Sequence, residues 1–363
     1  MIMKRIGVVI IWIMLAHCSG EQSQAILPTE KTIELDIVKK RSFNLSNGKI
    51  LIGRLESPMF IKEIDGEKKY LFYDSGLNNI IISDTTGLIK TNFGGVGSGP
   101  NEFRHITSFG TAEDHVIVYD ASLDVVKKFD FEGILIDSYL GLLEDKLWVR
   151  SNRLYEYNSK LIIGVQESEK SSSKNHWDSK TIALYDLKGN FQSLMGKYDP
   201  TLIGSGLLYN YANIVFDTKE GMIYTVHRTS PYIQKFDIES GELVHRFGFI
   251  SDNFRISDER PNAGDPRVVK NKINIQFSFV GDPFITKDYF LFYFFSFTEE
   301  AFELRDQNAL INFLQVFKKN GEYVGDIELP FYPLGANENN EIFLLEIDSS
   351  SSIKIGVYEF TIQ

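Results

Sequence analysis

The chain has 363 residues, of which 43% are hydrophobic and 13% aromatic, and its formal net charge is −11. This composition supports a large buried core, and the 28 Phe and 17 Tyr residues favour β structure. An acidic chain is a poor partner for nucleic acid or for an anionic lipid surface, so we expect neither as a binding partner.

The N-terminus has the three parts of an export signal. Lys4 and Arg5 form a short basic region, and residues 6–16 form an apolar run that is too short to span a bilayer. Cys18, the only cysteine of the chain, follows after one intervening residue, His17. The segment Leu15-Ala16-His17-Cys18 resembles the lipobox of bacterial lipoproteins, whose cysteine becomes the acylated first residue of the mature protein. The alternatives are an ordinary signal peptide with an incidental cysteine and a retained anchor.

The lipobox resemblance divides the chain into three parts. Residues 1–17 are expected to be a lipoprotein signal peptide, residues 18–31 a polar tether, and residues 32–363 the folded domain. Lipid attachment at Cys18 implies a protein of the cell envelope that contacts the membrane only through its anchor. We expect the outer membrane, with the domain facing either the periplasm or the outside.

A structural unit repeats after 46 residues (120−74, 130−84 and 133−87). The matched pairs are Asp74 and Asp120, Asp84 and Asp130, and Gly87 and Gly133. They flank apolar β segments, which are residues 70–74 and 80–84 in the first copy and 116–120 and 125–130 in the second. A period in the forties with paired β segments is typical of a propeller blade, and the Asp-x-x-Gly sequence predicts a tight hairpin at its end.

Four looser copies continue the repeat to the C-terminus. Their segments are 161–165 and 182–189, 222–226 and 232–241, 289–295 and 311–321, and 342–346 and 353–360. The last copy lacks its outermost strand, which Thr32–Val38 or Lys49–Leu55 could supply, because pairing the two ends removes an open sheet edge. The sequence therefore predicts an all-β, six-bladed β-propeller closed by an N-terminal strand; seven blades would need one undetected copy.

A glycine-rich segment lies between the first two copies, Phe93-Gly94-Gly95-Val96-Gly97-Ser98-Gly99-Pro100-Asn101-Glu102-Phe103. Followed by a strand, Tyr-Asp and Phe-Asp-x-x-Gly, it resembles the NHL- and TolB-like repeats of six-bladed β-propeller lipoproteins of Bacteroides-type bacteria. The resemblance is specific over residues 70–141 and diffuse beyond them. It implies fold and location, and little chemistry.

The sequence gives no support for a metal, a cofactor or a hydrolytic serine. The six histidines form no His-Glu-x-x-His or other close ligand pair, and no Gly-x-Ser-x-Gly elbow or complete EF-hand loop occurs. We therefore predict no cofactor and favour a binding module over an enzyme. A propeller enzyme, such as a lactonase, lyase or glycan-active enzyme with its site at the central channel, is the alternative. A structural subunit of an envelope complex is a third possibility.

The long segments indicate where a partner would bind. They are Glu167–Ser179, Lys197–Tyr211, Phe249–Asn274 and Thr298–Asn308, and all fall between second and third strands or between blades, which places them on one face. Loops that lengthen on one side of a rigid scaffold commonly carry recognition. We expect this loop-rich face to bind a protein, small molecule or glycan, with Arg104, His105 and Arg228 as ligand contacts.

Overall fold

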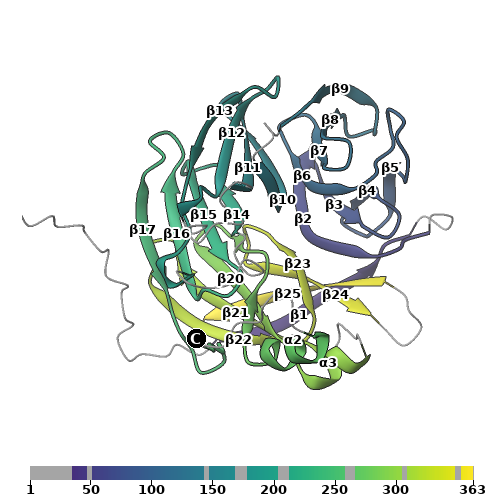
Figure 1. Ribbon diagram of the computed structural model, residues 1–363. Coiled ribbons are helices and arrows are strands. Elements are labelled where there is room, and N and C mark those ends of the chain that lie inside the picture. Colours follow the sequence, from purple (N-terminus) through teal and green to yellow (C-terminus); the bar gives the residue numbers. More distant parts are fainter. Residues whose placement is uncertain are drawn as a thin grey trace, which may run out of the picture.

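The computed structural model describes residues 35–46, 51–142, 147–167, 178–202, 212–257, 266–304, 309–347 and 353–362. Figure 1 shows small twisted sheets arranged about a common centre, in a propeller-like fold. The prediction of an all-β, propeller-like architecture is confirmed. The signal peptide, the tether and the lipid-attachment residue Cys18 lie outside the described residues.

The strands form four small sheets and one sheet of eight strands. The first small sheet has the order β2-β3-β4-β5, with β2 Leu55–Ile64, β3 Glu67–Asp74, β4 Asn79–Asp84 and β5 Ile89–Gly94. The second has the order β14-β15-β16-β17, with β14 Ala212–Asp217, β15 Met222–His227, β16 Tyr232–Asp237 and β17 Leu243–Gly248.

The third small sheet contains β18 Ser278–Val280, β20 Tyr289–Ser296, β21 Ile311–Lys318 and β22 Tyr323–Leu329, with β19 Phe284–Ile285 also paired to β20. The fourth has the order β1-β25-β24-β23 and joins β1 Leu35–Asn44 to β23 Tyr332–Ala336, β24 Glu341–Ile347 and β25 Ile353–Ile362. In Figure 1, β1 lies beside β25, and the two pair antiparallel from Leu35↔Ile362 to Asn44↔Lys354.

The eight-stranded sheet is curled and consists of two antiparallel groups of four. One group contains β6 Ile106–Thr111, β7 Val116–Asp120, β8 Val125–Phe129 and β9 Leu135–Leu140. The other contains β10 Leu147–Tyr157, β11 Lys160–Glu167, β12 Ile182–Asp186 and β13 Phe191–Met195. A single parallel pair, Arg153↔Phe109, joins β10 to β6.

The first strands of the successive groups form a ring. Contacts run from β2 to β6, β10, β14, β19 and β23 and return from β23 to β2. Between neighbouring sheets lie separate apolar clusters; one of them packs Leu71 and Ile82 against Phe109 and Val118. The core is therefore divided among the spaces between neighbouring sheets.

The helices lie in the long segments that the sequence assigns to loops. They are η2 Pro200–Leu202, α2 Arg267–Asn274 and α3 Glu299–Leu304. In the part of the chain that the structure describes, none is long and apolar enough to cross a membrane.

The repeated Asp-x-x-Gly sequences form the predicted tight hairpins. Asp84 Oδ1 accepts hydrogen bonds from the N–H groups of Thr86 and Leu88, and Asp130 and Asp186 bind their own turns in the same way. Gly87 closes the first turn with φ +90°, in the left-handed region that favours glycine. The hairpin prediction is therefore confirmed for these three turns.

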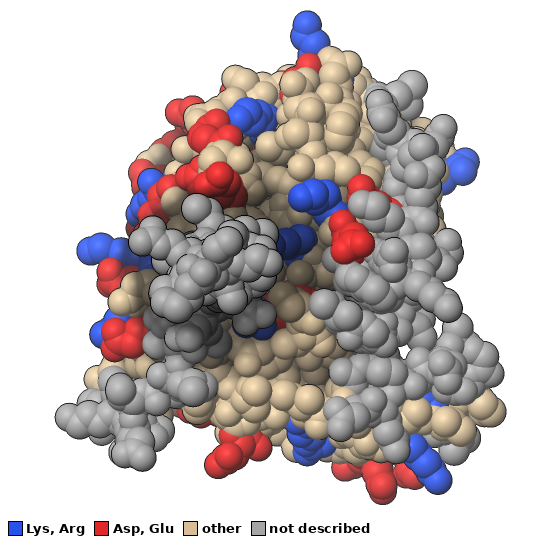
Figure 2. Space-filling view, turned by 60° about the vertical axis from the view of Figure 1, so that its left-hand side comes forward, with Lys and Arg blue, Asp and Glu red and all other residues tan. Residues whose placement is uncertain are grey.

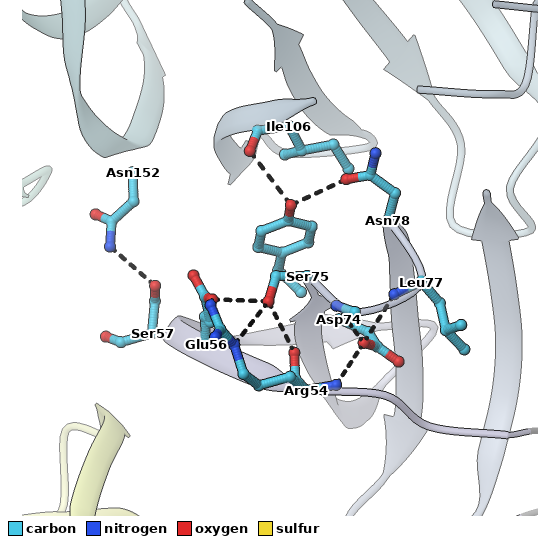
Figure 3. A network of polar contacts seen from close by, with 11 residues as sticks. Arg54, Glu56, Ser57, Asp74, Ser75, Leu77, Asn78, Ile106 and Asn152 are labelled. Carbon is cyan, nitrogen blue, oxygen red and sulfur yellow. Dashed lines mark hydrogen bonds and ion pairs between the residues drawn. The ribbon is translucent and has the colours of Figure 1, made fainter. Parts of the chain in front are cut away.

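The repeated Asp at the end of the second strand has a different role. Asp74 is fully buried at the end of β3. Its carboxylate accepts N–H groups from Gly53 (2.6 Å) and Arg54 (2.8 Å), which precede β2. It also accepts those of Gly76 (3.0 Å) and Leu77 (3.3 Å), which follow β3 (Figure 3). One side chain thus satisfies four backbone donors and joins the entry of β2 to the exit of β3.

Asp120 repeats this arrangement in the next group. It is fully buried, and it binds the N–H groups of Arg104 (2.6 Å) and His105 (3.2 Å) before β6. It also binds those of Ser122 (3.0 Å) and Leu123 (3.2 Å) after β7. The 46-residue repeat is therefore a repeat of one hydrogen-bonded junction.

Removal of this carboxylate is expected to destabilise the fold. Asp120→Ala leaves four backbone N–H groups without their acceptor, so the free energy of unfolding should fall by about 2–4 kcal/mol. Urea unfolding followed by circular dichroism measures the change. Asp137→Ala on exposed β9 is the matched control, and it should change the free energy by less than about 0.5 kcal/mol. Equal losses in the two variants would contradict the proposed role of Asp120.

Candidate functional site

A cavity of about 500 Å³ lies at the centre of the ring. Its lining comes from the ends of β2, β10, β14, β19 and β23 and from the short turns that follow several of them. These turns lie on the face opposite the long loops, because the first and second strands are joined there. The cavity therefore opens on the hairpin face, which is not the face that sequence reasoning favoured for binding.

The cavity wall is about half apolar, and polar side chains form the rest. Its apolar part includes Met59, Phe60, Val215, Phe216, Phe284 and Ile285. Phe216 and Phe284 are almost fully buried, and both present aromatic surface to the cavity. Pockets for small organic molecules commonly combine such a wall with a few polar groups, and their volumes range from about 300 to 1,000 Å³.

The charged lining is more basic than acidic. The basic side chains are Lys68, Arg153, Lys219, Lys287 and Lys319, and the acidic ones are Glu63, Asp217 and Glu338. Five positive and three negative groups leave an excess of two positive charges (5 − 3) in a chain whose net charge is −11. The cavity is thus locally basic in an acidic protein.

Two of the lysines are neutralised by ion pairs. Lys319 Nζ lies 2.6 Å from Asp217 Oδ2, and this pair is largely buried. Lys219 Nζ lies 2.5 Å from Glu338 Oε1 in an exposed pair. Lys68 and Lys287 are exposed and form no ion pair with the described residues.

Arg153 is the buried cation of the cavity. It lies on β10 and is only 4% exposed. Its Nη1 donates to the carbonyl of Pro283 at 2.6 Å, and its guanidinium carbon lies 5.3 Å from the centre of the Phe284 ring. Its Nε is buried and has no hydrogen-bond partner. Burial raises the pKa of neighbouring Tyr155, and the charge of Arg153 opposes this shift.

A polar network joins the first strands next to the cavity. Asn152 on β10 donates from Nδ2 to the Ser57 carbonyl (2.8 Å) and to Asp282 Oδ2 (2.6 Å). Figure 3 shows Asn152 reaching across to Ser57 from the opposite strand. Asn213 on β14 donates to the carbonyl of Gly281 at 3.1 Å. These bonds tie strands from several sheets together next to Arg153, the residue after Asn152.

The sequence-predicted contact residues lie on the loop-rich face. Arg104 is exposed, and its Nε donates to Ser98 Oγ at 2.8 Å. His105 is also exposed, and its backbone is held by Asp120. Arg228 follows β15, and its guanidinium carbon lies 5.2 Å from the centre of the Phe279 ring. The structure describes no contact that joins Arg228 to Arg104 or His105, and their role in binding stays a prediction.

A buried polar cluster lies near Arg228. Arg246 binds Asp199 through Nε (2.7 Å) and Nη2 (3.1 Å), and Asp199 is fully buried. His227 is also fully buried, its ring centre lies 5.2 Å from that of Tyr198, and neither ring nitrogen has a hydrogen-bond partner. Burial lowers the pKa of His227 to about 4, while Asp199 opposes this shift and Arg246 reinforces it.

The face that Figure 2 displays has no large patch of a single charge that would indicate a further binding site. Acidic and basic side chains alternate there around a central hollow, with basic side chains at its edge. Within the described ranges, no group of three or more His, Cys, Asp or Glu side chains is arranged to hold a metal ion.

The stability of the protein should depend on pH through His227. The folded state binds the proton less tightly than the unfolded chain, whose histidine has a pKa near 6.5. Stability from this residue is therefore complete above pH 6.5 and is lost as the pH falls toward about 4. Between pH 6.5 and about 4, the unfolding free energy of the wild type should fall by roughly 2–4 kcal/mol more than that of His227→Gln.

Urea unfolding at a series of pH values measures this dependence. His105→Gln, which changes an exposed histidine, should leave the pH profile of the wild type intact. Identical profiles for wild type and His227→Gln would show that the buried histidine does not control stability.

Comparison with known proteins supports the fold. No protein-family model and no curated protein matches the chain. Among solved structures, a member of the DUF4221 family from Bacteroides vulgatus superposes with a TM-score of 0.69 at 12% identity, over 92% of this chain and 100% of the other. A protein from Bacteroides fragilis that is named as exported superposes with a TM-score of 0.60 at 12% identity, over 93% and 98%. At this identity the likeness shows a shared propeller-like fold and nothing of activity.

Proposed function

We propose that this protein is a lipid-anchored, extracytoplasmic six-bladed β-propeller that binds a small organic ligand in its central cavity. The observation that carries the proposal is the cavity of about 500 Å³ at the centre of the ring, with a wall that is about half apolar and a buried arginine. The size and the mixed lining match those of small-molecule sites in general.

The strand groups support the proposal of six blades. Counting the curled eight-stranded sheet as two blades gives six groups, in agreement with the six first strands that contact one another in a ring. In this interpretation β1 is the outer strand of the last blade, because it pairs with β25 at the sheet edge. That strand begins at Leu35 and overlaps Thr32–Val38, one of the two segments that the sequence offered.

The proposed location has two supports. The N-terminal segment that ends at Cys18 resembles a lipobox. In addition, the Bacteroides fragilis protein of similar fold is named as exported. Both agree with a domain outside the cytoplasm that a lipid holds at the membrane, and we propose the outer membrane.

An enzyme with its site at the channel is the alternative. The cavity contains three carboxylates, but Asp217 and Glu338 each bind a lysine. Acid–base catalysis by two carboxylates would have to displace one of these lysines, whereas ligand binding needs no such change. This arrangement favours a binding protein. The loop-rich face, with Arg104, His105 and Arg228, stays a predicted surface for a partner.

Filling the cavity should abolish ligand binding. Ala336 is half-buried in the cavity lining, so Ala336→Trp places an indole where the ligand would lie. We expect a loss of at least about tenfold in affinity for 4-phenylbutanol and 4-phenylbutyrate, measured by ligand-observed NMR titration. Ala121→Trp, at an exposed turn on the loop-rich face, is the control and should bind like the wild type. Unchanged binding by Ala336→Trp would show that the site lies elsewhere.

Lipid attachment should depend on Cys18. Cys18→Ala removes the only thiol that could be acylated, so the protein should move from the membrane fraction to the soluble fraction. Fractionation of cells followed by immunoblotting measures the distribution. Cys18→Ser is a second variant without the thioether linkage and should behave in the same way. Equal partition of wild type and variants would contradict the lipoprotein assignment.

A further inference from the structure

We propose that the central cavity takes an organic anion, an acid with an apolar body, and that Arg153 binds its acidic group. The inference rests on the proposed function of the cavity as a ligand site. It adds the chemical class of the ligand and the residue that selects it.

The argument starts from the incomplete bonding of Arg153. A guanidinium carries five N–H donors and a permanent positive charge. Here one nitrogen donates to the Pro283 carbonyl and the side chain also hydrogen-bonds Tyr155, but Nε has no partner. No carboxylate of a described residue forms an ion pair with the guanidinium; the buried Asp282, which precedes Pro283, accepts from Asn152 instead. A buried charge without a counter-charge is costly, because the side chain has lost its water. A bound anion would remove this cost.

A purely structural role would leave this bonding unexplained. The bond to Pro283 and the contact with the Phe284 ring do tie β10 to the segment that contains β19. A neutral donor such as the amide of Asn152 already makes a bond of this kind one residue earlier. Arg153 differs from Asn152 in that it carries a positive charge facing the cavity. A guanidinium group can bind both oxygens of a carboxylate through two parallel hydrogen bonds.

The outer part of the cavity favours the same ligand. Lys68 and Lys287 are exposed lining residues without an ion pair among the described residues, so they can attract an anion to the entrance. The chain as a whole carries −11 and would otherwise repel it. Local positive charge is therefore needed at an anion site in this protein.

The apolar part of the wall restricts the class of anion. The Phe284 ring lies against the Arg153 guanidinium, and Phe216 and Val215 also line the cavity. A small inorganic ion would leave this surface in contact with water, whereas an aliphatic or aromatic body would bury it at roughly 25 cal/mol per Å². The geometry therefore points to a carboxylic acid with an apolar body rather than to free phosphate or a sugar acid.

The experiment compares an acid with its neutral analogue. The purified protein is titrated with 4-phenylbutyrate and with 4-phenylbutanol, and the two dissociation constants are measured by NMR. We expect the acid to bind at least about tenfold more tightly. Arg153→Met should weaken binding of the acid by about 10–100-fold and change binding of the alcohol by less than about threefold.

Two variants serve as controls. Arg150→Met removes an arginine from the same strand outside the cavity lining and should leave both constants unchanged. Arg153→Lys keeps the positive charge but loses the planar pair of N–H donors that can bind both carboxylate oxygens. It should bind the acid with an affinity between those of the wild type and Arg153→Met. If Arg153→Met does not fold, a loss of acid preference in Arg153→Lys still supports the proposal, and full retention of it contradicts the role of Arg153.

The remaining outcomes separate the inference from the function on which it rests. Equal affinity for acid and alcohol, with both lost in Ala336→Trp, would overturn the anion inference and leave the cavity as a ligand site. Failure of Ala336→Trp to affect any probe would overturn both. Glucuronate or inorganic phosphate binding as tightly as 4-phenylbutyrate would show that the ligand is a polar oxyanion, contrary to the apolar body proposed here.

Discussion

Backbone N–H groups inside a protein must find an acceptor, and the junctions of this fold depend on buried carboxylates that supply one. Asp74 and Asp120 each bind two N–H groups before a first strand and two after a second strand. Each carboxylate therefore fixes where a first strand begins. The first strands contact one another in a ring, and the opposite ends of β2, β10, β14, β19 and β23 line the cavity. The Asp74 junction thus fixes the start of β2, one of the strands whose other end lines the cavity.

Later in the chain, residues other than aspartate stand at the end of the second strand of each group. The second strands β11, β15 and β20 end at Glu167, His227 and Ser296. At β15 the imidazole of His227 is buried with no partner on either nitrogen, so it does not reproduce the four bonds of the aspartate. Long segments follow β11 and β20, whereas residues 228–231 alone separate β15 from β16. At β11 and β20, where the aspartate junction is absent, the connection that follows is longer.

The repeat explains why so much of the fold could be predicted. Tyr-Asp and Asp-x-x-Gly mark strand ends by local hydrogen bonds, and a local pattern is visible in the chain itself. Strand β10 escaped prediction because neither motif marks it and because polar residues such as Ser151 and Asn152 interrupt its apolar positions. Arg153 lies on that strand. Its importance comes from residues more than a hundred positions away, Pro283 and Phe284, and no local spacing could identify it. The cavity was not predicted either, because it depends on how strand ends from distant parts of the chain converge; binding at the loop-rich face stays a prediction.

Pairing of β1 with β25 has a consequence for how the molecule is made. Leu35 meets Ile362 across the sheet, so this contact spans nearly the whole described chain. A ribosome or an export machine delivers β1 first and its partner last. Until then β1 is an unpaired edge with exposed hydrogen-bonding groups, which other chains could join. The charged residues Lys39, Lys40 and Arg41 on this strand oppose such association. Assembly of the complete ring is therefore a late event, and a chain that stops short of β25 leaves its first strand without a partner.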